Sequence, residues 1–148
     1  MHILIVVIGV AVLLFNTCGS NRMGAQNNQN SVVLSEISQS FSNSVHRYFQ
    51  REHGKDDLRV ETDLLRAGGT ETGIAFPKYY AWVRVFDHQE FVQEGAIRVA
   101  RVEENLYEVT HFVSVDKIRE NPQETFQIFP KSLAEQVIQR ANASKNSR

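Results

Sequence analysis

The sequence is poor in cysteine and in net charge. Its 148 residues include one cysteine, Cys18, so no disulfide can form within the chain. The formal net charge is only −1, from 16 basic and 17 acidic residues, which leaves no strongly basic surface. Nucleic-acid binding normally needs such a surface, so no nucleic acid is expected among the partners.

Motifs of known catalysts are also missing. There is no Gly-x-Ser-x-Gly nucleophile turn, no His-Glu-x-x-His zinc helix and no glycine pattern for a dinucleotide. The sequence therefore predicts no cofactor and no metal, and it favours a protein that is not an enzyme. His46 and His53 are seven residues apart and could share a face with a metal. A solvated helix end that carries Arg47, Arg51, Glu52 and His53 is the preferred interpretation.

The remaining composition is that of a folded chain, with 42% hydrophobic residues and nine Phe. The length fits one domain. The sequence predicts four parts: an export segment over 1–18, a polar tether over 19–31, a single α+β domain over 32–143, and a disordered tail over 144–148. The tether is rich in Asn and Gln and has too few apolar side chains to bury.

The export segment rests on the uninterrupted apolar run Ile3–Phe15. A run of this length is typical of a signal peptide and is short of the roughly 20 residues that span a bilayer. Only Met1 and His2 precede it, so the usual basic start is missing.

Cys18 follows this run closely and precedes the small residue Gly19. The arrangement resembles the lipobox of bacterial lipoproteins, although Phe15, Asn16 and Thr17 depart from its usual residues. The resemblance implies that the Cys18 thiol is diacylated and that the lipid holds the protein on a membrane of the cell envelope. The alternatives are a protein secreted into the periplasm and an uncleaved hydrophobic anchor.

The folded part begins with a predicted helix over Val33–His53, ended by Gly54. A strand is predicted over Leu58–Arg66 and a loop over Ala67–Pro77. A three-stranded meander over Lys78–Val115 follows. The hydrophobic pattern then predicts one helical turn over Asp116–Glu120, a short strand or packed extended segment over Glu124–Phe129, and a helix over Lys131–Asn142.

Alternation within the meander sets its predicted register. Tyr80 is placed opposite Ile97, and Trp82 opposite Gly95, on a strongly apolar face that packs on the first helix. Between the last two strands, Val99 is placed opposite Val109 and Ile97 opposite His111. The other face is expected to be partly open to water. The predicted fold is α+β: an N-terminal helix packed on a curved antiparallel sheet of about four strands, with a short C-terminal helix.

This order of elements resembles cystatin-like and nuclear-transport-factor-like domains over Val33–Val115. The resemblance is one of topology and implies a curved sheet wrapped around a helix. Cystatins carry a Gln-x-Val-x-Gly hairpin that Gln93-Glu94-Gly95 does not match. Inhibition of cysteine proteases is therefore not implied.

One face of the meander offers a candidate ligand pocket, whose members share aromatic or charged character: Tyr80, Trp82, Arg84 and His111. His111 could act as a general acid or base if Glu94 or Asp87 lay close. The alternative is a histidine at the edge of the core with a local hydrogen bond.

The sequence favours a membrane-tethered, extracytoplasmic domain with a non-enzymatic role, binding a protein partner or serving envelope structure. Its alternative is a small-ligand or enzymatic pocket of the cystatin-like or nuclear-transport-factor-like kind. A deep pocket that holds His111 with a carboxylate would favour the alternative, and a filled core with an exposed apolar patch would favour the partner. No oligomeric state is indicated.

Overall fold

The computed structural model describes residues 39–72 and 75–144. Within them the fold is α+β, as predicted: a helix, an antiparallel sheet and three C-terminal helices follow one another along the chain. The export segment, Cys18, the tether over 19–31 and the start of the predicted first helix lie outside the described residues.

Helix α1 is described over residues 39–53 and packs through an apolar stripe. Phe41, Val45 and Phe49 recur every four residues, and each is at most 5% exposed. The helix ends where the sequence predicts, at Gly54, whose φ of 64° is in the left-handed region. His46 Nε2 lies within hydrogen-bond distance of the Leu58 carbonyl and ties the helix to the first strand.

Replacing Gly54 by alanine is expected to lower the free energy of unfolding by about 1 kcal/mol, because a Cβ disfavours the left-handed region. Nothing lies within 4 Å of the added Cβ, so backbone conformation alone sets the cost. Urea denaturation measures it. Gly54→Asn should cost less, since asparagine tolerates this region. Equal losses in both variants would contradict this explanation.

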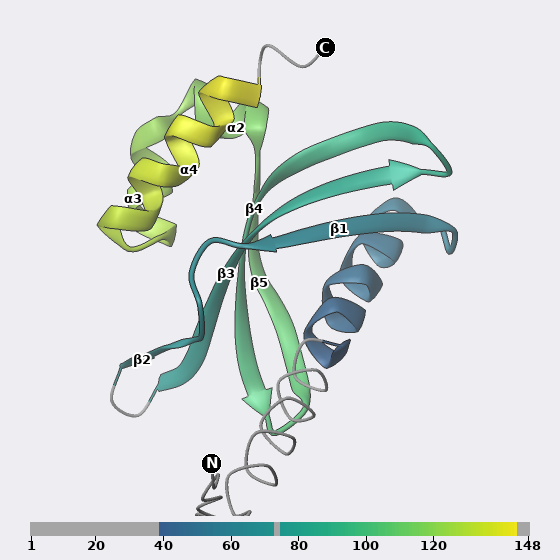
Figure 1. Ribbon diagram of the computed structural model, residues 1–148, viewed down its shortest axis with the longest axis horizontal. Helices are drawn as coiled ribbons and strands as arrows, with labels where there is room; N and C mark the ends of the chain where they lie inside the picture. The colour runs from purple at the N-terminus through teal and green to yellow at the C-terminus, as the bar shows by residue number, and fades with distance from the viewer. Residues whose placement is uncertain (1–38, 73–74, 145–148) are drawn as a thin grey trace, which may run out of the picture.

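The sheet has five antiparallel strands in the order β1-β3-β4-β5, with β2 also paired to β3 (Figure 1). Their bounds are β1 Leu58–Leu64, β2 Thr70–Thr72, β3 Ala75–Asp87, β4 Glu90–Glu103 and β5 Leu106–Ser114. The segment Ala67–Pro77, predicted as a loop, therefore contains β2 and the start of β3. β1 and β5 form the two edges of the main path.

The predicted register between β3 and β4 is correct at the hairpin and wrong beyond it. Phe86 pairs with Phe91, but the next pair joins Val85 to Gln93, so Val92 is an extra residue in β4. This bulge shifts every later pair by one residue. Trp82 therefore pairs with Ala96, and Gly95 does not lie opposite it.

A second bulge acts in the same way between β4 and β5. Val99 pairs with Val109 as predicted, but Ile97 pairs with Phe112 and not with His111, because Thr110 is the extra residue. Bulges strengthen the local twist of a sheet.

Helix α1 and the C-terminal helices lie at different places along the sheet (Figure 1). The sheet carries a hydrophobic core on each face, one under α1 and one under the C-terminal helices. Ala81, Val83 and Val85 of β3 face α1, together with Ile97 and others. Tyr80 and Trp82 face the C-terminal helices. The prediction that Tyr80 and Trp82 pack on the first helix was wrong. The bulge in β4 shifts the pairing by one residue, so Ala81, and not Tyr80, lies opposite Ile97 on the face under α1.

Both helical segments predicted after the sheet, Asp116–Glu120 and Lys131–Asn142, are confirmed, and a further helix lies between them. The three helices are α2 Val115–Glu120, α3 Pro122–Ile128 and α4 Lys131–Ser144. Ser114 caps α2 by accepting a hydrogen bond from the Lys117 amide at 3.4 Å. Glu124–Phe129 was predicted as extended and is mostly helix α3, because Pro122 occupies a first-turn position where its missing N–H costs nothing.

Candidate functional site

Two members of the predicted ligand pocket are core side chains. Tyr80 is 4% exposed and Trp82 is 2% exposed. The Tyr80 ring packs on Phe129 with 5.8 Å between ring centroids, and the Arg140 guanidinium lies 5.0 Å from the Trp82 ring centroid. The C-terminal helices therefore occupy the space in which a ligand would contact these two rings.

The other two members, Arg84 and His111, are exposed. Arg84 forms an ion pair with Glu61 of β1, with 2.9 Å between Nη2 and Oε2. His111 lies on β5 and pairs with Arg98 of β4. The structure thus places Tyr80, Trp82, Arg84 and His111 on one face of the sheet. Trp82 and Arg84 line one open pocket of about 280 Å³ with Glu94 and Arg140, and Tyr80 and His111 are not among the residues that line it.

Arg98 contacts the His111 ring and favours its neutral form. The Arg98 Nη2 group lies 2.6 Å from His111 Nδ1 and can only donate, so Nδ1 accepts and the neutral ring carries its proton on Nε2. Arg98 also donates to the Thr110 hydroxyl and to the Ile128 carbonyl. Partial burial lowers the pKa of His111, and the charge of Arg98 lowers it further.

An NMR titration is expected to show the pKa of His111 below its ordinary value and to show it rise in Arg98→Gln. Because the pKa of His111 is lowered in the folded state, the unfolded chain binds this proton more readily. His111 therefore favours the folded state when the pH is above its ordinary pKa. That contribution declines as the pH falls through the lower, folded-state pKa. A pKa of His111 that is the same with and without Arg98 would contradict the geometry.

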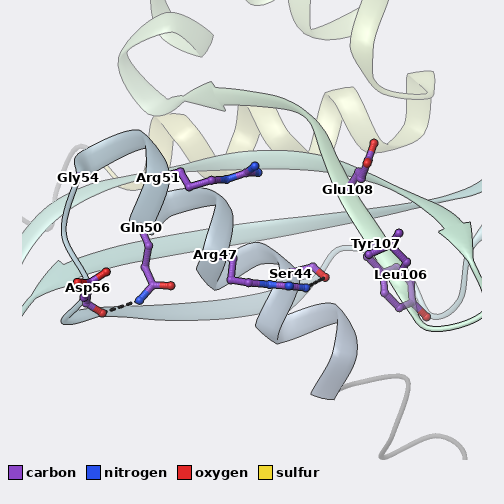
Figure 2. Close-up of a pocket in the computed structure, with 9 residues that line it drawn as sticks. All are labelled: Ser44, Arg47, Gln50, Arg51, Gly54, Asp56, Leu106, Tyr107 and Glu108. Atoms are coloured by element: carbon purple, nitrogen blue, oxygen red, sulfur yellow. Dashed lines mark hydrogen bonds between the residues drawn. The ribbon is translucent and has the colours of Figure 1, made fainter.

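A different surface has the features of a binding site: a groove of about 600 Å³ between α1 and the start of β5 (Figure 2). It is lined from α1 and the turn after it by Ser44, Arg47, Gln50, Arg51, Gly54 and Asp56, and from β5 by Leu106, Tyr107 and Glu108. None of these residues was predicted as a site.

Helix α1 runs along β5, and two aromatic contacts fix this. Phe41 packs on Tyr107 near the start of the strand with 5.6 Å between ring centroids. Two turns later Phe49 packs on Phe112 near its end with 5.1 Å between centroids. The flank of the helix beside these contacts therefore follows the strand.

Arg47 and Arg51 stand on that flank, one helical turn apart and both exposed. In Figure 2 both side chains extend from α1 across the groove toward β5. Arg47 donates to the hydroxyl of the buried Ser44 at 3.3 Å. Among the described residues, neither arginine has a carboxylate within 4.0 Å.

The floor of the groove at β5 is Tyr107, which is 3% exposed. Burial raises the pKa of its hydroxyl, and the neighbouring Tyr79 raises it further, so this group stays neutral at physiological pH. Alternation along β5 sends the Glu108 side chain to the opposite side of the strand, as Figure 2 shows. Arg47 and Arg51 are the basic residues among those that line the groove, and Asp56 and Glu108 are the acidic ones.

β5 is an edge strand. Its inner side pairs with β4 from Leu106 to Ser114, and no strand of the described residues pairs with its outer side. Leu106 is 38% exposed at the mouth of the groove. The sequence pattern placed Arg47 and Arg51 at a solvated helix end and did not indicate a site there.

Comparison with known protein families, with curated proteins and with solved structures finds no match. Within residues 39–72 and 75–144, no helix is long and apolar enough to cross a membrane. The same residues contain no group of three or more metal-binding side chains. His46 and His53 contact the Leu58 carbonyl and the Gln93 side chain, respectively.

Proposed function

We propose that this protein is a non-enzymatic binding domain that takes a protein partner in the groove between α1 and β5. Its N-terminal segment carries the domain out of the cytoplasm, and a lipid on Cys18 or the hydrophobic segment holds it at a membrane of the envelope. Residues 19–31 act as a spacer between membrane and domain.

The observation that carries this proposal is the meeting of an open edge strand and two exposed arginines in one groove. Edge strands with unpaired backbone groups readily accept another chain. Arginine is enriched where proteins bind each other, since its planar fork pairs with carboxylates.

The side chains first considered for a small-ligand pocket support the proposal by their positions. Tyr80 and Trp82 fill the core under α4, and Arg84 is paired with Glu61. His111 faces a cation rather than a carboxylate, so the pair that would make it a general base is not formed. Binding through the groove needs none of these groups.

Photo-crosslinking in the cells that make the protein tests this function. A photoreactive amino acid at Leu106, in the full-length chain, should give an adduct with another protein. The adduct should be lost when Arg47→Glu and Arg51→Glu are added. The same photoreactive residue at Gln136, an exposed position of α4, is the matched control and should give no such adduct.

An equal yield at Leu106 and Gln136, or no adduct at Leu106, would contradict the proposed function. An adduct with twice the chain mass of 16.9 kDa would identify a second copy of this chain as the occupant and would contradict a separate partner.

A further inference from the structure

The groove has the form that strand addition requires. An extended segment laid beside β5 would pair with its open backbone edge and continue the sheet beyond that strand. The side chains of the segment would alternate between the two faces, so every second one would point toward α1. Arg47 and Arg51 are the charged groups that those side chains would meet.

The spacing of the two arginines matches such a segment. Four residues of α-helix rise about 6 Å, and two residues of strand span roughly 6.5–7 Å. Since α1 runs along β5, two acidic side chains at alternate positions of an added strand would each reach one arginine. Adjacent acidic residues would point to opposite faces, and only one would reach an arginine.

The opposite edge of the sheet is less suited to this use. β1 carries Arg59, Glu61 and Asp63, and these side chains are engaged with neighbours in ion pairs or over the Phe86 ring. Charged side chains along an edge discourage the addition of another strand. On β5 the titratable side chains that flank the edge are Tyr107, Glu108 and His111.

A second copy of this chain does not fit the groove as well. The side chains that β5 sends toward α1 are Tyr107, Val109 and Phe112, and none of them is acidic. A β5–β5 pairing between copies would therefore leave Arg47 and Arg51 without carboxylates.

We infer that β5 accepts an extended acidic segment of a partner protein as an added strand, with acidic side chains at alternate positions paired to Arg47 and Arg51. This inference rests on the proposed function and adds the conformation and charge of the partner segment.

Selection from a random dodecapeptide library on the full-length chain tests it. Enriched peptides should carry Asp or Glu at alternate positions among residues that favour β-strands. Their affinity should fall at least tenfold in Arg47→Gln/Arg51→Gln, and binding should disappear in Arg47→Glu/Arg51→Glu. Arg66→Glu, at an exposed arginine outside the groove, is the matched control and should leave the affinity unchanged.

Backbone N-methylation of an enriched peptide tests strand addition itself. The N–H groups of alternate residues face β5, so methyl groups on one set of alternate residues should abolish binding. Methyl groups on the other set should leave binding within about twofold, because those N–H groups face solvent. Equal effects of both sets would overturn strand addition.

Other outcomes overturn the inference in distinguishable ways. Enriched peptides without acidic residues at alternate positions would overturn the inference, as would no enrichment over an empty surface. If a Leu106 adduct still forms in cells, the proposed function stands. Loss of both the enrichment and the adduct removes the function as well. Arginine-dependent retention on vesicles with 30% phosphatidylglycerol, without peptide binding, would assign the groove to a lipid surface and overturn the inference.

Discussion

Replacing Gly95 by alanine is expected to lower the free energy of unfolding by about 3 kcal/mol or more. A Cβ at this position would lie 2.2 Å from the Val113 carbonyl oxygen and 2.9 Å from the Ser114 Cα. Both are backbone atoms of β5, at the point where the strand passes into α2. They cannot move without breaking the pairing of Gly95 with Ser114.

The loss is large because domains of this size are stable by only about 5–15 kcal/mol. Urea denaturation of wild type and variant, followed by circular dichroism, measures it. Gly68→Ala is the matched control: its φ is 78° and no atom lies within 4 Å of the added Cβ, so a loss of about 1 kcal/mol is expected. A Gly95→Ala protein as stable as Gly68→Ala would contradict the close contact between β4 and β5.

Trp82→Ala is expected to cost about 3–5 kcal/mol, the range for removing a fully buried large aromatic side chain. Trp82 is 2% exposed and packs in the core between the sheet and α2–α4. Its loss should leave a cavity under α4, and the C-terminal helices should show faster amide hydrogen exchange than α1.

Arg84→Ala provides the control on the same strand and the same face of the sheet. Arg84 is exposed and its ion pair with Glu61 is at the surface, where such pairs contribute at most about 1 kcal/mol. A loss as small as that of Arg84→Ala would contradict the burial of Trp82, and faster exchange confined to α1 would contradict its place under the C-terminal helices.

Hydrophobic periodicity was sufficient to predict where most elements lie. The end of α1 at Gly54 and the start of β1 at Leu58 agree with the structure, as does the start of α4 at Lys131. These boundaries are set by local chemistry: a left-handed glycine, alternating apolar residues and a proline before a helix. Glu124–Phe129 was missed because its apolar residues are too few to separate a short helix from a strand.

The side of β3 that faces α1 could not be read from alternation. The hairpin begins in the predicted register, with Asp87 opposite Glu90, and the bulge at Val92 then shifts the pairing by one. Each face of β3 is apolar enough to be buried, so the pattern alone does not choose between them. Three-dimensional packing makes the choice, by placing α2–α4 over Tyr80 and Trp82.

The groove was missed for a related reason. Arg47 and Arg51 are ordinary exposed residues of an amphipathic helix, and Leu106 is the first residue of β5, directly after a turn. Nothing in their spacing along the chain relates the helix to the strand. Their relation arises from Phe41 and Phe49, which hold α1 along β5 and so set the two arginines beside its open edge.

Amide hydrogen exchange along β5, in the full-length chain with and without a selected acidic peptide, tests the binding role of this edge most directly. Binding should slow exchange at alternate amides between Leu106 and Val113, those that face outward from the sheet. The amides of β1 should remain unchanged. Protection on β1, or unchanged exchange along β5 in a peptide-saturated protein, would contradict the assignment of β5 as the strand that receives the partner.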